Sequence, residues 1–302
     1  MQAQWTSRRC ALTSATRCVL AALLVIGASA CASAPSARGR RAMDEGAYEE
    51  AARAFREAAQ GSPRDADLWL ELGRAEMAAQ RPARARDAFI RASLLQPANP
   101  QPRILIGHTW ELERRWDEAL AAYLQAVQVA PHQARPYRVL GTRLLRWGRP
   151  ADAVEPLARA VAIAPAHAET WKALALARYH GGDIAAAEQS FRDGIALNAD
   201  HRGLRLGLAA LLVNAHRFEE ALSVYAAVLD REPELAAAHV GRALLLHELH
   251  RQAEAEAAFE AAVRVARDPR PYRARLLAYR QLRAREATAQ RADAPAPARD
   301  PR

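Results

Sequence analysis

The side chains that could carry chemistry are few in this sequence. Its 302 residues include three cysteines and nine histidines. His247 and His250 are the closely spaced pair that could hold a metal ion, but two imidazoles are only part of such a site, and no further Cys/His cluster completes it. The sequence also lacks G-x-S-x-G, G-x-G-x-x-G, H-E-x-x-H and P-loop motifs. We therefore predict no enzyme activity, no metal and no cofactor.

The cysteines point instead to export. Residues 1–17 are polar and basic, and residues 18–30 form an apolar run of 13 residues. Such a run is too short to span a bilayer and is typical of the core of a signal peptide. The sequence therefore predicts a signal peptide over residues 1–30.

Cys31 follows the apolar run directly. The segment Ala28-Ser29-Ala30-Cys31 is similar both to a signal peptidase site and to a bacterial lipobox, whose cysteine becomes diacylated. Cys10 and Cys18 lie inside the signal, so Cys31 would be the only cysteine of the mature chain, which favours lipidation. Ala28 stands where a lipobox usually has leucine. Simple secretion and an uncleaved anchor remain the alternatives.

The residues around this segment indicate a destination. In the lipoproteins that the sequence resembles, a residue other than Asp after the cysteine, here Ala32, accompanies sorting to the outer membrane. We expect a lipoprotein facing the periplasm, with a secreted or periplasmic protein as the alternative. Ser7-Arg8-Arg9 faintly resembles a twin-arginine signal. Because the usual phenylalanine is missing, the general secretory route is favoured.

A period of 34 residues runs through most of the chain. Seven alanines share one phase of this period: Ala51, Ala85, Ala119, Ala153, Ala187, Ala221 and Ala255. Four residues after each alanine comes a bulky side chain, in turn Phe55, Phe89, Tyr123, Leu157, Phe191, Tyr225 and Phe259. A register kept over seven repeats without an insertion predicts a repeat protein.

Each repeat carries two helical patterns. In residues 66–99, Trp69, Leu72 and Gly73 have the spacing of one helix face, and Ala85 and Phe89 have that of a second. This pattern resembles the tetratricopeptide repeat. The resemblance implies an all-α fold, a right-handed α-solenoid of about seven 34-residue helix-turn-helix repeats, each of which must pack on its neighbours.

The period also sets the predicted boundaries. We expect a tether over residues 31–37, a solenoid over 38–269, a capping helix over 270–290 and a disordered tail over 291–302. The predicted repeats are 32–65, 66–99, 100–133, 134–167, 168–201, 202–235 and 236–269. Pro156 lies inside a predicted second helix, where it predicts a late start or a kink.

Charge gives no support for nucleic-acid binding. The net charge is +9, but residues 1–30 carry three arginines and no acid, and residues 270–302 carry nine arginines and three acids. The remaining residues, 31–269, are therefore balanced, so the high pI indicates no phosphate-binding surface. We predict no nucleic-acid partner.

The resemblance implies a binding groove lined by the first helices. The residues at its groove positions are Arg74, His108, Arg135, Arg138, Arg146, Lys172, Tyr179, Leu206, Val240 and Leu244. This set is basic in the middle and apolar toward the C-terminus, which favours a protein or peptide with a carboxylate and an apolar anchor. Alternatively, arginine is simply the common polar residue of this sequence, and the leucines and valines pack between helices.

These patterns together predict a non-catalytic protein-interaction scaffold of the bacterial cell envelope, held on the membrane by an N-terminal lipid. The architecture resembles the lipoprotein pilotins that help to assemble type IV pilus secretins, which implies a role in pilus or secretion-complex assembly. An adaptor for peptidoglycan or protease complexes, and an accessory subunit of an envelope enzyme, are the alternatives.

Overall fold

A computed structural model describes residues 35–292 of the chain. The predicted signal peptide and Cys31 lie outside these residues, as do residues 293–302 of the predicted tail. The chain divides into two compact bodies, Met1–Leu140 and Gly141–Arg302. We call them the N-terminal and the C-terminal body and describe each by itself.

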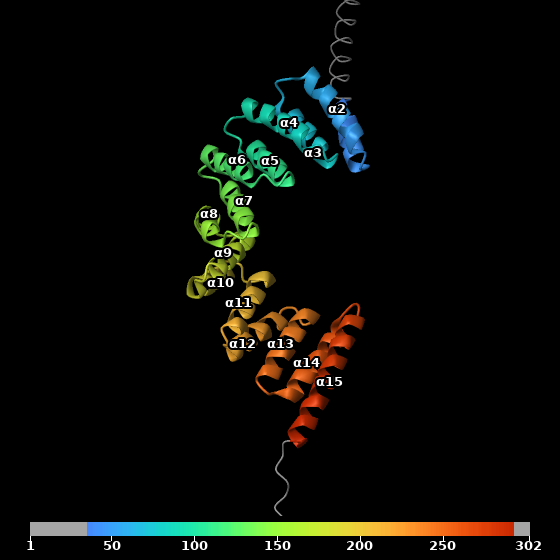
Figure 1. Ribbon diagram of the computed structural model, residues 1–302, viewed down its shortest axis with the longest axis vertical. Coiled ribbons are helices and arrows are strands. Elements are labelled where there is room, and N and C mark those ends of the chain that lie inside the picture. The colour runs from blue at the N-terminus through green and yellow to red at the C-terminus, as the bar shows by residue number, and fades with distance from the viewer. Residues whose placement is uncertain (1–34, 293–302) are drawn as a thin grey trace, which may run out of the picture. The chain divides into compact units, whose positions relative to one another are not determined.

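The N-terminal body consists of helices that pack on one another in chain order (Figure 1). Residues 35–44 form the first of them. The next are α2 (Tyr48–Gly61), α3 (Ala66–Ala78), α4 (Pro82–Leu95), α5 (Pro100–Leu112) and α6 (Trp116–Val129). Helix α7 (Ala134–Arg146) begins in this body and ends in the next one.

The C-terminal body continues the same alternation of first and second helices. It contains α8 (Pro150–Ile163), α9 (Ala168–His180), α10 (Ile184–Leu197), α11 (Arg202–Asn214), α12 (Phe218–Leu229), α13 (Ala236–Glu248), α14 (Gln252–Val265) and α15 (Arg270–Ala292). Helix α9 packs on α11 as well as on α10, so first helices of neighbouring repeats share one layer. The described residues contain helices and no strand, which confirms the all-α solenoid.

A close contact between a glycine of the first helix and a ring of the second holds helix pairs of the N-terminal body together. All seven phased alanines are fully buried, and so are Phe55, Phe89, Tyr123, Leu157 and Phe191. A Cβ atom added to Gly73 would lie 2.3 Å from the ring of Phe89, and one added to Gly107 would lie 2.5 Å from Tyr123. Because glycine has no side chain, the ring of the second helix can lie against the backbone of the first.

The turn between the two helices of a repeat has one conformation throughout. Its residue with positive φ recurs every 34 residues, at Gly46, Gln80, Arg114, Gly148, Gly182, His216 and His250. The amide of the following residue donates to the carbonyl five residues before it, as from Arg251 to Leu246. This is the Schellman arrangement, which satisfies the last carbonyls of the first helix.

An ion pair recurs where the second helices begin. Arginine precedes α6, α8, α12 and α14, and its guanidinium pairs with a carboxylate three residues later, in Arg115–Glu118, Arg149–Asp152, Arg217–Glu220 and Arg251–Glu254. Each acid lies in the first turn of its helix, where the helix dipole also favours negative charge. The sequence analysis did not identify these pairs.

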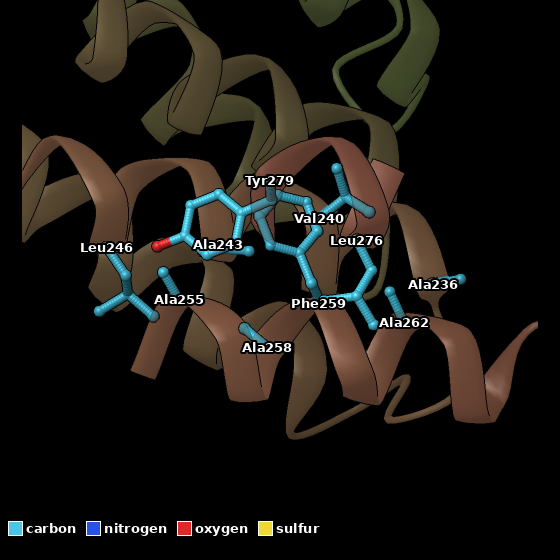
Figure 2. Packing of buried hydrophobic residues seen from close by; sticks show 10 residues of the cluster. All are labelled: Ala236, Val240, Ala243, Leu246, Ala255, Ala258, Phe259, Ala262, Leu276 and Tyr279. Atoms are coloured by element: carbon cyan, nitrogen blue, oxygen red, sulfur yellow. The ribbon is translucent and has the colours of Figure 1, made fainter. Parts of the chain in front are cut away.

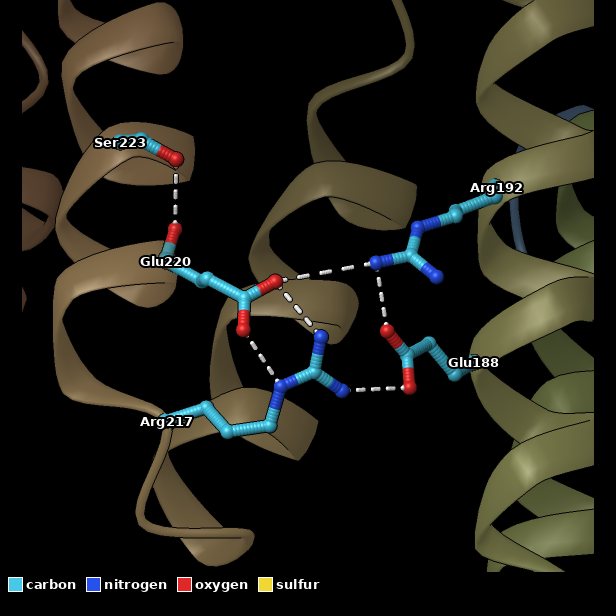
Figure 3. Close-up of polar contacts among 5 residues, drawn as sticks. All are labelled: Glu188, Arg192, Arg217, Glu220 and Ser223. Carbon is cyan, nitrogen blue, oxygen red and sulfur yellow. Dashed lines mark hydrogen bonds and ion pairs between the residues drawn. The ribbon is translucent and has the colours of Figure 1, made fainter.

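One of these pairs extends into a network between neighbouring repeats (Figure 3). The carboxylate of Glu188, on α10, lies 2.6 Å from Arg192 and 2.7 Å from Arg217, which precedes α12. The side chain of Glu188 is only 12% exposed, and each of its two carboxylate oxygens pairs with an arginine. The network therefore joins the start of α12 to the preceding repeat.

The structure differs from the sequence predictions at three places. Helix α8 begins at Pro150 and runs through Pro156, so the late start was wrong. Residues 35–37, predicted in the tether, are already helical. Helix α15 ends at Ala292, two residues beyond the predicted end, because the Arg- and Ala-rich sequence there still favours a helix.

The glycine contact predicts a specific loss of stability. Gly73→Ala should lower the free energy of unfolding by about 1–3 kcal/mol, because the buried ring of Phe89 must move to admit the new methyl group. Gly61→Ala is the matched control, since no atom lies within 4 Å of the added Cβ. Urea unfolding of both variants tests this. Equal midpoints would contradict the close contact.

The ion pairs predict a dependence on acid. The hydrogen bonds from Arg217 hold the pKa of Glu220 below its ordinary value. The ionised pair therefore stabilises the fold fully above the pKa of the unfolded state, about 4.3, and this contribution is lost as the pH falls through the lower folded pKa.

We expect Glu220→Gln to lower the thermal midpoint at pH 6 and to leave a weaker dependence of that midpoint on pH between 5 and 3. Glu155→Gln is the control, because Glu155 is exposed and makes no ion pair within the described residues. Thermal unfolding followed by circular dichroism is the measurement. A parallel pH dependence in both variants would show that the pair contributes nothing.

Candidate functional site

The predicted groove residues of the N-terminal body differ in their surroundings. Arg74 pairs with Glu71 on the same helix, so its charge is compensated. The ring of His108 lies edge-on to Tyr123, 5.8 Å between centroids. Arg135 lines a pocket with the turn over residues 96–101, and Arg138 lies half-buried on α7.

In the C-terminal body, several of the predicted groove residues contact other residues of the same body. Lys172 lies 2.6 Å from Glu169, and its hydrogen bond is the main cause of the lowered pKa of that carboxyl group. Tyr179 accepts a hydrogen bond from Asn214. Leu206 packs on the cluster of Val228, Leu229 and Ala238 between repeats. Arg146 is exposed at the end of α7.

Val240 and Leu244 line one pocket of about 440 Å³. Helix α13 contributes these two residues and His247 to its wall. Helix α15 contributes Arg275, Ala278, Tyr279 and Leu282. Phe259 of α14 forms part of the lining between them. The pocket therefore lies where the last repeat meets the C-terminal helix.

Helical spacing explains why these residues share a pocket. Val240, Leu244 and His247 are four and three residues apart, so they lie on one face of α13. On α15, Arg275, Tyr279 and Leu282 have the same spacing. Two helices thus present matching faces to the same space.

Two aromatic rings hold the α15 wall against the last repeat. The rings of Phe259 and Tyr279 lie 4.9 Å apart between centroids, within a buried cluster that also holds Val240 and Leu276 (Figure 2). The hydroxyl of Tyr279 donates to the carbonyl of Gln252 over 3.4 Å, and burial raises the pKa of this phenol. Buried side chains of α15 therefore pack this helix on the last repeat.

The polar groups of the pocket differ in their hydrogen-bond and ion-pair partners. The ring of His247 lies edge-on to Tyr279, with centroids 5.5 Å apart, and its Nε2 lies 3.9 Å from Glu286. Its buried Nδ1 makes no hydrogen bond within the described residues. Arg275 is exposed and makes no ion pair in the same part of the chain. As far as the structure describes the chain, the pocket is thus apolar with the unpaired cation Arg275 at its rim.

Comparison with known families now identifies the repeats. One sequence model described as tetratricopeptide repeat matches residues 42–108, and a second model with the same description matches residues 110–168, 138–202 and 206–274. The chain belongs to the tetratricopeptide repeat family. Tetratricopeptide proteins bind protein partners, and the fold is generally a non-catalytic interaction scaffold.

Solved structures share this tetratricopeptide fold. The C-terminal part of a repeat-containing protein from Cytophaga hutchinsonii is 14% identical with a TM-score of 0.60, and the match covers 75% of this chain and 93% of that one. PilF of Pseudomonas aeruginosa is 18% identical with a TM-score of 0.52, over 70% of this chain and 99% of that one. No curated protein matches the sequence.

The structure also bears on the metal site considered from the sequence and on membrane-spanning helices. His250 occupies the exposed turn after α13, whereas His247 faces α15, so the two imidazoles do not converge. Residues 35–292 contain no group of three potential metal ligands. No helix among the same residues is both long enough and apolar enough to cross a membrane.

The α15 side of the pocket was not predicted from the sequence, because residues 270–290 were expected only to cap the last repeat. The apolar residues Tyr272, Leu276 and Tyr279 follow one another at spacings of four and three. This spacing could have predicted an α15 face that packs on α14, and hence a neighbouring face that lines a pocket.

The aromatic contact predicts how firmly α15 is attached. Tyr279 is only 5% exposed, so Tyr279→Ala should cost about 3–5 kcal/mol and lower the unfolding midpoint. Tyr279→Phe keeps the ring and loses one long hydrogen bond, so its cost should stay within about 1.5 kcal/mol. Leu277→Ala, at a site 59% exposed on the same helix, is the control. A wild-type midpoint for Tyr279→Ala would show that α15 does not cover Phe259.

Proposed function

We propose that this protein is a non-catalytic scaffold of the bacterial cell envelope that binds partner proteins in the pocket between α13 and α15. The pocket itself is the observation that supports this function most directly. Leu244 and Leu282 are 54% and 44% exposed at its edge, although both are large apolar side chains. Exposed apolar side chains that gather at a pocket favour binding of another surface.

The envelope location rests on the N-terminal sequence. A basic segment, an apolar run of 13 residues and Cys31 follow one another as they do in bacterial lipoproteins. A lipid on Cys31 would hold the repeats at a membrane surface without a spanning helix. We propose the outer membrane, with the repeats in the periplasm.

Pilus or secretion-complex assembly is the process we propose for the scaffold. The order of signal segment, cysteine and tetratricopeptide repeats supports it, because pilotin lipoproteins are similarly built. The likeness to PilF concerns the fold alone at 18% identity. The partner is accordingly expected to be a subunit of an envelope complex.

Replacement of the cysteine tests the membrane attachment. Cys31→Ser should move the protein from the washed membrane fraction to the soluble periplasmic fraction, because the thiol that accepts the lipid is lost. Fractionation followed by immunoblotting is the measurement, and Cys10→Ser inside the signal is the control. A Cys31→Ser protein that stays in the washed membranes would rule out lipid anchoring.

Crosslinking in living cells tests the scaffold role. The wild-type protein should crosslink to a subunit of an envelope complex, identified by mass spectrometry, and Leu244→Asp should reduce that product. Secretin or pilus subunits would support the proposed process. Cell-wall hydrolases or proteases would contradict it, and the absence of any crosslinked protein would contradict the scaffold itself.

A further inference from the structure

We infer that the pocket between α13 and α15 selects partner segments that place a bulky apolar side chain next to a carboxylate. In this arrangement the apolar side chain enters between Leu244 and Leu282, and Arg275 binds the carboxylate. The inference rests on the proposed scaffold function and adds the chemistry of the partner.

The arginines on α15 differ in whether they are paired with an acid. Arg280 contacts both Glu256 and Glu260, and Arg283 contacts Glu286. Arg275 lines the pocket, yet it has no acidic partner within the described residues. A carboxylate from another molecule would supply the missing ion pair, and arginine can hold a carboxylate by two parallel hydrogen bonds.

The described lining of the pocket carries no acidic side chain. The pocket residues of α13, α14 and α15 include no aspartate or glutamate, so no side chain there would repel a carboxylate. Two acids lie beside the lining: Glu286 is 3.9 Å from His247, and both Glu286 and Glu256 interact electrostatically with Tyr279. Helix α15 as a whole carries seven arginines against one acid, Glu286. The local charge therefore favours an acidic partner.

The pocket has the size and the apolar lining to admit a bulky side chain. A volume of about 440 Å³ lies within the usual range of ligand pockets, about 300–1,000 Å³, and admits a bulky side chain. Val240 and Phe259 are buried beside the pocket, so an entering side chain would meet apolar atoms. An apolar side chain would thereby cover the exposed parts of Leu244 and Leu282.

Other occupants fit these observations less well. A symmetric dimer formed through this pocket would bring the arginine-rich α15 of one copy against that of the other, so like charges would face each other. The chain's own segment 293–302, Asp-Ala-Pro-Ala-Pro-Ala-Arg-Asp-Pro-Arg, contains acids but no bulky apolar side chain. A separate acidic and apolar partner segment satisfies both parts of the pocket.

Selection from a library of random linear peptides tests this chemistry. The probe is a phage-displayed library, panned on the detergent-solubilised full chain after removal of phage that bind Leu244→Asp. We expect the enriched peptides to carry Leu, Ile, Phe or Met within one helical turn of Asp or Glu. Enrichment of basic peptides, or no enrichment above the Leu244→Asp protein, would falsify the inference.

Charge reversal then tests the role of Arg275. Arg275→Glu should weaken binding of a synthetic enriched peptide by about tenfold or more, and replacing the peptide's acid by Lys should restore part of the affinity. Arg273→Glu is the matched control, because Arg273 is exposed on the same helix, makes no side-chain ion pair within the described residues and does not line the pocket. Equal loss for both variants would remove the specific role of Arg275.

Two further measurements separate the possible outcomes. Native helix content, measured by circular dichroism, must be retained in each variant, which the exposure of Leu244 and Arg275 favours. A wild-type dimer that dissociates in Leu244→Asp during analytical ultracentrifugation would assign the pocket to a second copy and overturn the inference. If crosslinking to the envelope partner persists while peptide selection fails, the scaffold function stands and the partner chemistry is wrong.

Discussion

The contact between a glycine and a buried ring is the constraint on which the rest of the structure depends. The ring of Phe89 lies where a Cβ of Gly73 would be, and Tyr123 does the same at Gly107. In the C-terminal body such a contact also joins two repeats: the ring of Phe191, on α10, lies against Gly207 of α11 in the next repeat. Close approach therefore occurs both within and between repeats, and no repeat buries its rings by itself.

Sequence was sufficient for the fold because the buried positions recur at one period. The seven alanines and the bulky side chains four residues later repeat 34 residues apart, and burial leaves little freedom in residue type there. The turns were harder to predict. Gln80, Arg114, His216 and His250 adopt positive φ without being glycine, so residue type does not reveal the Schellman turn. Their register does, because Gly46 and Gly148 occupy the same phase.

The candidate site was less predictable because it depends on which charges are compensated in space. Lys172 has the groove phase, but Glu169 compensates its charge from one turn away. Tyr179 meets Asn214, 35 residues later in the chain, and no spacing within one repeat predicts that pair. Val240 and Leu244, two of the predicted groove residues, line one pocket. The opposite wall of that pocket was not predicted, because α15 does not follow the repeat pattern.

Because α15 follows the last repeat, the same helix both covers the buried core of that repeat and lines the proposed binding pocket. The last repeat exposes Phe259 unless another element covers it, and Leu276 and Tyr279 supply that cover. A helix that packs along one face leaves its adjacent faces exposed, which here carry Arg275 and Leu282. Tyr279 both attaches the helix and lines the pocket, whereas the exposed Arg275 and Leu282 lie only at the pocket rim. The rim can consequently change to suit a partner while the cover of Phe259 remains intact.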